Sequence, residues 1–309
     1  MQKELPTITA EQIAKTHNAQ KVVIVASRRT DIPAFHIQEL IDGLQKGIFH
    51  PQPMMNRVRK FVFAPYEIHS IGLWSQNFTN WIEQRRKIHG LDYKFWYRFT
   101  ILPDNKICKP KAPPVDEQLK QLETLTKTDG AGSTFLFVDP LIKYRNLGVK
   151  KWQYNFSEKS LRQIFEKASS LGIKRIGTSF LDYYKKIERQ TKSLGVKFRF
   201  LDPAVLTDRN QMIEMLSVLE SVAREYEIAV KTCCEKLICS YGASQRGACV
   251  DGTLLNKLFG PGASTKHDNG QRTSHGCACT YAIDIGRYTD RGQWSHACGH
   301  ECPQCYARP

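Results

Sequence analysis

Three cysteines near the end of the sequence have the spacing C-x3-C-x2-C: Cys298, Cys302 and Cys305. Three thiolates in a tight loop can each bind one iron of a four-iron cluster, whereas a fully coordinated cluster normally has four cysteine ligands. The iron left open can chelate the amino and carboxylate groups of S-adenosylmethionine. An electron from the cluster then breaks a carbon–sulfur bond and yields a 5′-deoxyadenosyl radical. The spacing therefore predicts a [4Fe–4S] cluster that cleaves S-adenosylmethionine.

A second pair of cysteines, Cys277 and Cys279, has a C-x-C arrangement and opens an alternative. A structural zinc ion takes four ligands in a closed tetrahedron. Two further ligands could come from the terminal histidines and cysteines, which are His296, Cys298, His300, Cys302 and Cys305. Zinc pairs usually have the spacing C-x2-C, which only the last two cysteines show, so the spacing favours the iron–sulfur cluster. The two centres are compatible, because Cys277 and Cys279 could bind zinc or a second cluster.

Strand-like and helix-like stretches alternate through most of the chain. Short, continuously apolar runs suit strands buried on both faces, and they lie at residues 22–27, 69–74, 95–101, 134–139, 175–180, 198–202 and 228–232. Amphipathic segments that predict helices lie between them, at residues 34–46, 78–89, 115–127, 157–171, 182–194 and 208–226. The alternation predicts an α/β fold with a parallel sheet, either a complete or partial TIM-like (β/α) barrel or an open doubly wound sheet.

The alternation stops near residue 236, where cysteine and glycine become frequent. We predict a barrel-like domain over residues 1–236 and a Cys-rich, irregular metal-cluster segment over residues 237–309, packed on that domain. Within this segment, residues 253–259 are the stretch that looks helical. A long irregular segment needs something other than a hydrophobic core to hold it, and a metal centre would serve.

Polar residues follow the predicted strands at their carboxyl ends, where parallel sheets carry their functional side chains. Arg28, Arg29 and Asp31 directly follow the first strand. We expect Arg28 or Arg29 to bind the carboxylate of S-adenosylmethionine. Asp31 is a candidate catalytic residue, and the alternative is that it caps the next helix.

Later strand ends supply further candidates. Asp139, Asp202 and Glu235 are candidates for binding the ribose of S-adenosylmethionine. Cys233 and Cys249 are candidate thiol hydrogen-atom donors in catalysis, and the alternative is that they are small buried residues in the core.

The chain of 309 residues carries 45 Lys and Arg against 30 Asp and Glu, a formal net charge of +15. Such an excess attracts polyanions or solvates the surface, so a DNA or RNA base is a candidate substrate. The sequence has no run of about 18 apolar residues and no signal peptide, which predicts no membrane association and a cytoplasmic location. Ten cysteines in that compartment are not expected to form a disulfide framework.

Several motifs resemble those of a bacterial family of domains of unknown function. They are SRRTDIPAF (27–35), IGLWSQN (71–77), VDPL (138–141), RGACVDGTLLNKLFG (246–260), DNGQRTSHGCACTYAIDIGRY (268–288) and CGHECPQCYA (298–307). The C-terminal cysteines of that family have been likened to those of radical S-adenosylmethionine enzymes. The resemblance implies an enzyme of that mechanism class, with an electron donor such as a flavodoxin or ferredoxin, and it implies no substrate. The alternative is a zinc-stapled nucleic-acid-binding protein without catalysis.

Overall fold

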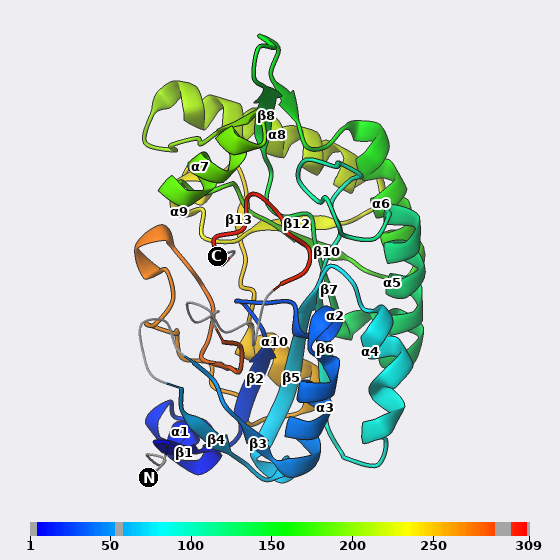
Figure 1. Cartoon of the computed structure of the whole chain (residues 1–309), viewed down its shortest axis with the longest axis vertical. Helices are drawn as coiled ribbons and strands as arrows, with labels where there is room; N and C mark the ends of the chain where they lie inside the picture. Colours follow the sequence, from blue (N-terminus) through cyan, green and yellow to red (C-terminus); the bar gives the residue numbers. More distant parts are fainter. Residues whose placement is uncertain (1–4, 53–57, 288–297, 308–309) are drawn as a thin grey trace.

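The centre of the fold is an eight-stranded sheet in which every hydrogen-bonded pair of strands is parallel (Figure 1). The structure, a computed structural model, describes residues 5–52, 58–287 and 298–307. From edge to edge the strands are β13 (Gln245–Arg246), β12 (Ala229–Thr232), β10 (Arg175–Thr178), β7 (Thr134–Phe137), β6 (Phe95–Thr100), β5 (Ile68–Ser75), β2 (Val22–Ala26) and β14 (Ile283–Asp284). The mixed α/β fold with a large parallel sheet is confirmed. Within the described residues the edge strands β13 and β14 do not pair with each other, so hydrogen bonds do not close the sheet into a complete barrel.

Helices lie between the strands close to where the amphipathic segments predict them. They are α1 (Ala10–Thr16), α2 (Ile32–Phe35), α3 (Ile37–Lys46), α4 (Thr79–Gln84), α5 (Val115–Asp129), α6 (Glu158–Ser170), α7 (Lys185–Ser193), α8 (Leu206–Glu225), α9 (Lys236–Ser240) and α10 (Gly252–Phe259). Short 3-10 turns are η1 (Pro65–Glu67), η2 (Arg85–Ile88), η3 (Ala131–Ser133) and η4 (Thr273–His275). In Figure 1, α3, α4, α5 and α6 stand along one side of the sheet.

The sheet is buried on both faces, which explains its continuously apolar strands. Along β2, Val22, Ile24 and Ala26 belong to the large core that includes the helices on one face. Val23 and Val25 point the other way, into a second core formed with the C-terminal segment. The sequence after residue 236 therefore covers the second face of the sheet.

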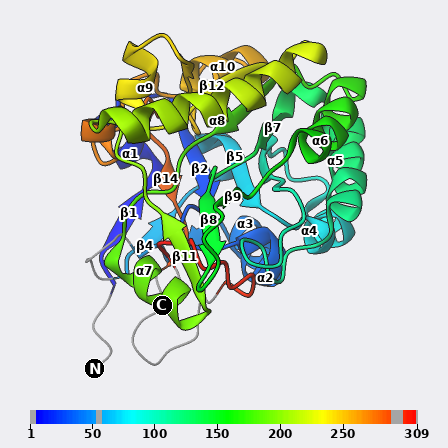
Figure 2. The same ribbon diagram turned by 90° about the horizontal axis from the view of Figure 1, so that it is seen from above.

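A separate antiparallel sheet of β11 (Val196–Arg199), β8 (Lys143–Asn146) and β9 (Gln153–Tyr154) lies beside α7 (Figure 2). The prediction that residues 198–202 form a strand of the parallel sheet is wrong. In β11, Val196 and Phe198 are buried while Lys197 and Arg199 are exposed. Such alternation is typical of an antiparallel strand with one solvated face. A third sheet joins β1 (Thr7–Thr9), β4 (Lys60–Val62) and β3 (Ile48–Phe49).

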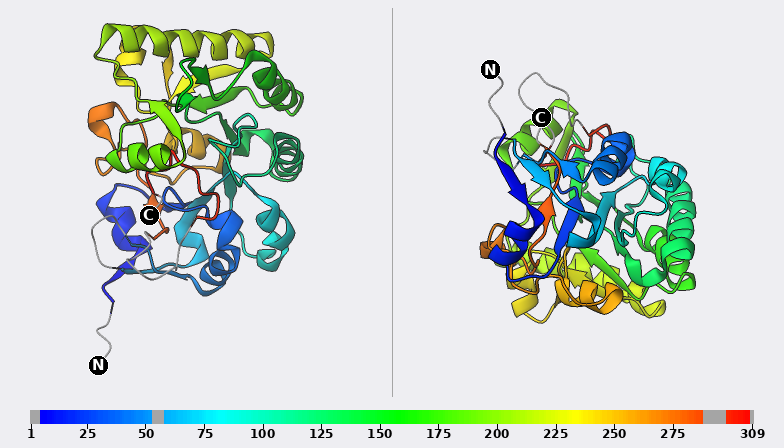
Figure 3. Two further views of the ribbon diagram at one scale, coloured as in Figure 1. Left: turned by 45° about the horizontal axis from the view of Figure 1, so that its top comes forward. Right: turned by 90° about the horizontal axis from the view of Figure 1, so that it is seen from below.

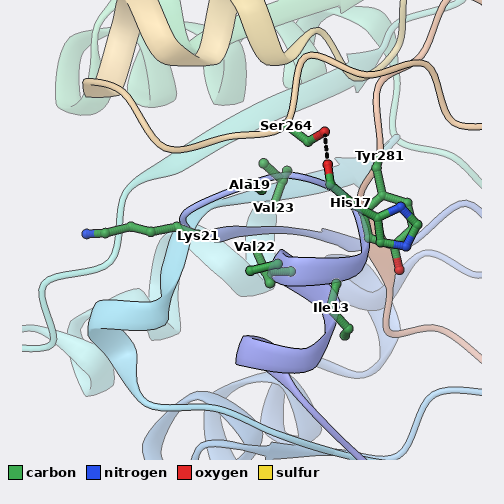
Figure 4. A pocket seen from close by; sticks show the side chains of 9 residues that line it. Ile13, His17, Ala19, Lys21, Val22, Val23, Ser264 and Tyr281 are labelled. Atoms are coloured by element: carbon green, nitrogen blue, oxygen red, sulfur yellow. Dashed lines mark hydrogen bonds between the residues drawn. The ribbon is translucent and has the colours of Figure 1, made fainter.

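The C-terminal segment is more regular than predicted. Residues 253–259 are helical as expected, within α10, and the segment also supplies the two edge strands β13 and β14. His17, the residue that follows α1, contacts this C-terminal segment (Figure 4). The His17 ring stacks on the Tyr281 ring with centroids 3.2 Å apart, and the Ser264 hydroxyl donates to the His17 carbonyl at 2.8 Å. Among the described residues, no helix combines the length and apolar character needed to cross a membrane.

Candidate metal centre and active site

Asp31 joins three parts of the chain at the carboxyl ends of β2 and β5. Its Oδ1 accepts a hydrogen bond from the Ala34 amide at 3.1 Å, so it caps α2. Its Oδ2 accepts from the Ser75 hydroxyl at 2.8 Å, the Gln76 amide at 3.0 Å and the His300 ring Nε2 at 2.8 Å. The capping alternative for Asp31 is confirmed, and the same carboxylate also fixes the C-terminal loop to the sheet.

The loop that carries Cys298, Cys302 and Cys305 lies against these strand ends; Figure 3 shows it in red beside the blue N-terminal part of the chain. The Tyr306 hydroxyl donates to the Arg28 carbonyl at 2.7 Å, after β2, and the Gln304 amide donates to the Cys108 carbonyl at 2.6 Å, after β6. Gln76, after β5, also donates a hydrogen bond to the Cys302 sulfur, so the loop is bonded to residues that follow three neighbouring strands, β2, β5 and β6.

Gly299 lets this loop approach α2 closely. A Cβ atom at Gly299 would come within 2.5 Å of the Phe35 ring. The neighbouring His300 ring meets the same phenyl ring edge to face, at 4.8 Å between centroids. A larger side chain at Gly299 would therefore have to displace either the Phe35 ring or the cysteine loop.

The thiols of this loop are buried in a way that favours their protonated form. Burial, together with the nearby Asp31 and Cys305, raises the pKa of Cys298 to about 12 and that of Cys302 to about 11. Thiolates are the species that bind metals. Loss of these protons therefore needs a compensating positive charge, which a metal centre supplies.

The side-chain amide of Gln76 donates to the Cys302 sulfur at 3.4 Å. Within the part of the chain that the structure describes, no group of three or more His, Cys, Asp or Glu side chains is already arranged to hold a metal ion. His296, a ligand in the zinc alternative, lies outside the described residues.

Near the cysteine loop, two arginines, Arg28 and Arg98, lie against the ring of Trp74. The Arg28 guanidinium lies 5.2 Å from the Trp74 ring centroid, and the Arg98 guanidinium lies 4.7 Å from the same centroid. Arg28 and Arg29 both face Asp284 of β14, with nitrogen–oxygen separations of 3.9 and 3.6 Å. Arg98 was missed by the sequence reasoning because it lies inside a strand rather than after one, where no local signal marks it.

The acidic candidates lie in different surroundings. Asp139 pairs with Arg98 at 2.6 Å and accepts a hydrogen bond from Ser179. The Glu235 carboxylate accepts from the Phe180 amide at 3.0 Å, and burial raises its pKa to about 8. Asp202 is exposed and bonds to the Ala204 amide at 2.9 Å in the turn before α8. Asp139 and Glu235 therefore belong to the strand ends of the main sheet, and Asp202 does not.

Cys233 and Cys249, proposed from sequence as thiol donors, are brought together by the fold. Their sulfurs are 3.2 Å apart, and the Cys234 sulfur lies 3.7 Å from that of Cys233. Cys277 contacts Cys234, and Cys279 contacts Cys249. Five cysteine side chains thus meet on the second face of the sheet, and we name them the thiol cluster.

A cavity of about 320 Å³ adjoins the thiol cluster, between the sheet and α10. Cys233 lines it together with three basic residues, Arg175, Lys231 and Arg246, and one acidic residue, Asp251. The volume is in the range of small-molecule sites. Its excess of basic side chains suits a substrate that carries negative charge.

Comparison with solved structures gives distant likenesses to SuiB of Streptococcus suis. The structure of SuiB bound to the precursor peptide SuiA is 10% identical over 82% of this chain and 58% of SuiB, with a TM-score of 0.33. A second structure of SuiB is 11% identical over 75% of this chain and 54% of SuiB, with a TM-score of 0.34. SuiB bound to S-adenosylmethionine is 10% identical over 81% and 58%, with a TM-score of 0.33. This chain thus spans a little over half of the length of SuiB.

No curated protein matches the chain. A protein family does match it, over residues 23–307, which include all ten cysteines and the whole main sheet except Val22, the first residue of β2. The resemblance seen in the sequence motifs is thereby confirmed. The chain belongs to the family described as domain of unknown function DUF1848.

Proposed function

We propose that this protein is a radical S-adenosylmethionine-type enzyme whose [4Fe–4S] cluster is held by Cys298, Cys302 and Cys305. The observation that carries the proposal is the position of these three cysteines on one loop, which is hydrogen-bonded to Asp31 and Arg28 after β2, to Gln76 after β5 and to Cys108 in the segment that follows β6. That end of a parallel sheet is where enzymes of this architecture place their chemistry. When bound, the cluster would supply the electron that cleaves S-adenosylmethionine into a 5′-deoxyadenosyl radical.

The residues present fit such a cluster. Thiolates are its normal protein ligands, and three of them leave one iron for another molecule. Hydrogen bonds to the sulfurs and exclusion of solvent tune the potential of iron–sulfur clusters. Cys302 is 7% exposed, and Gln76 donates to its sulfur, so both conditions are met at this cysteine.

S-adenosylmethionine would bind beside this loop. The Arg28 Nη2 is buried and lacks a hydrogen-bond partner among the described residues, so it can receive a carboxylate, with Arg29 beside it. For the ribose, Asp139 and Glu235 are better placed than the exposed Asp202, because both follow strands of the main sheet. Asp31 is fully engaged with four donors, so we assign it to positioning the loop rather than to proton transfer.

The sheet itself is proposed to be a partial (β/α) barrel. Helices α3 to α6 lie along one face. The C-terminal segment covers the other face, between the two edge strands β13 and β14, which do not pair with each other in the described part of the chain. That arrangement would shield a radical from water, which prevents side reactions.

The cavity beside Cys233 is our proposed substrate site. Cys233 or Cys249 could donate a hydrogen atom there only as a protonated thiol that is free of metal. The three basic side chains of the cavity and the net charge of +15 support an anionic substrate, for which a nucleic-acid base in a single strand is our proposal. A flavodoxin or ferredoxin would supply the electron. Such chemistry, with ten free cysteines, suits a reducing cytoplasm.

Metal analysis of anaerobically purified protein tests the proposal. We expect Cys302→Ala to remove about four irons and four sulfides per chain relative to the unsubstituted protein. The matched control is Cys239→Ala, which removes a cysteine of α9 outside both cysteine groups and should keep the iron. Stoichiometric zinc without iron would instead support the zinc-stapled alternative.

A further inference from the structure

The thiol cluster is built from three separate stretches of the chain. Cys233 and Cys234 follow β12, Cys249 follows β13, and Cys277 and Cys279 precede β14. The contacts form a closed ring: the Cys233 sulfur lies 3.2 Å from that of Cys249, and Cys249 contacts Cys279. Cys279 contacts Cys277, Cys277 contacts Cys234, and the Cys234 sulfur returns to Cys233 at 3.7 Å. No pair of these cysteines forms a disulfide.

Hydrogen bonds around the ring hold these stretches in place. The Arg246 guanidinium donates to the carbonyls of Gly276 and Cys277, at 2.8 Å each, and so joins the end of β13 to the C-x-C pair. The Cys233 amide donates to the Thr178 carbonyl at 2.8 Å. Cys234 has a backbone φ of +62°, a conformation that is uncommon outside glycine and often marks a functional site. These hydrogen bonds therefore fix the backbone of the stretches that bring the five sulfurs together.

Two arginines lie beside the sulfurs, Arg98 in the interior and Arg272 in a more exposed position. Arg98 lies within electrostatic reach of Cys233 and Cys249, and its Nε atom is buried without a hydrogen-bond partner among the described residues. Arg272 forms a hydrogen bond with the Cys234 sulfur and an ion pair with Asp182. Both guanidinium groups are already paired with carboxylates, Arg98 with Asp139 and Arg272 with Asp182, and they would in addition stabilise the negative charge of metal-bound thiolates beside them.

We propose that the thiol cluster is a second metal centre with thiolate ligands, independent of Cys298, Cys302 and Cys305. Its occupant is a thiophilic metal, either a zinc ion or an iron–sulfur cluster, because both take four cysteine thiolates. In a tetrahedral zinc site with Zn–S bonds near 2.3 Å, the sulfurs lie about 3.8 Å apart, close to the 3.7 Å between Cys233 and Cys234. The 3.2 Å contact is too short for that geometry, so binding requires the Cys233 and Cys249 side chains to turn apart around the metal.

We call the cluster proposed on Cys298, Cys302 and Cys305 the first centre. To test for a second centre, the ligands of the first centre are removed and the metal that remains is measured. The full-length variant with Cys298, Cys302 and Cys305 all changed to alanine is purified without oxygen, and its zinc, iron and sulfide are measured. We expect either about one zinc, or about four irons with four sulfides, per chain, and these two results distinguish the occupants. Adding Cys249→Ala and Cys279→Ala should remove that metal, whereas adding Cys239→Ala should not.

A second measurement keeps Cys298, Cys302 and Cys305 and substitutes only the thiol cluster, so that it does not depend on the folding of the triple variant. Cys249→Ala with Cys279→Ala alone should lose the zinc, or about half of the iron, while the remaining iron still depends on Cys302. Replacement of the bound metal by cobalt should give thiolate-to-cobalt absorption that disappears in this double variant. A folded triple variant without metal, metal that survives the Cys249 and Cys279 substitutions, or a disulfide between Cys233 and Cys249 in anaerobic protein would overturn the second centre. None of these outcomes removes the first centre.

Discussion

His300 and Asp31 are 269 residues apart in the sequence, yet the His300 Nε2 lies 2.8 Å from the Asp31 carboxylate in the buried interior. His300 stands between Cys298 and Cys302, and Asp31 stands at the end of β2. Together with the bonds from Gln76, Gln304 and Tyr306, this contact fixes where the cysteine loop meets the sheet. It explains how a cysteine motif at the end of the chain can serve the face formed by the first strands.

We expect His300→Ala to loosen this loop. The substitution removes one of four donors to Asp31 and an edge contact with Phe35, so the free energy of unfolding should fall by about 1–3 kcal/mol. Urea unfolding, together with the iron content after purification, measures both effects. The control His89→Ala changes an exposed histidine and should stay within about 0.5 kcal/mol. Equal stability and iron content in the two variants would show that the contact does not hold the loop.

Gln76 should tune the cluster that Cys302 helps to hold. A hydrogen bond to a ligand sulfur stabilises the reduced, more negative cluster, so Gln76→Leu should make its reduction potential more negative. A redox titration followed by electron paramagnetic resonance measures the change. Gln163→Leu, on the outer helix α6, serves as the control and should leave the potential unchanged. A potential that does not respond to Gln76→Leu would remove this residue from the site.

The basic cavity predicts salt-dependent binding of single-stranded nucleic acid. Each neutralised phosphate releases counterions, so log K should fall with log salt with a slope of about −0.7 per contact. A gel-shift titration at about 50 and 200 mM salt measures this slope. Lys231→Glu, in the cavity, should weaken binding and reduce the slope by about one contact, more than Lys159→Glu on α6. Absence of binding at the lower salt would leave a small anionic molecule as the substrate class.

Local sequence patterns were sufficient for most of the fold. The strands β2, β5, β6 and β7 are buried along nearly their whole length, so each is a short apolar run that can be recognised without tertiary information. Residues 198–202 misled the prediction because a β-strand of the small antiparallel sheet has the same length and β-propensity. The edge strands β13 and β14 have two residues each, too few for any periodic signal.

The candidate site was less accessible from sequence. Arg28 and Asp31 follow a strand immediately, so their position at the sheet edge could be inferred. The pairing of Arg98 with Asp139 and the meeting of Cys233 with Cys249 depend on strand order, which the sequence does not encode locally. The same holds for His300, whose partner Asp31 is at the other end of the chain.

The most direct test of the account is product analysis after anaerobic incubation of the dithionite-reduced protein with S-adenosylmethionine. The account predicts that the unsubstituted protein forms 5′-deoxyadenosine and methionine, that Cys239→Ala does so equally, and that Cys302→Ala forms neither. Mass spectrometry of the small molecules gives the readout. Protein that carries a reduced cluster on Cys298, Cys302 and Cys305 but forms no 5′-deoxyadenosine would contradict the proposed function.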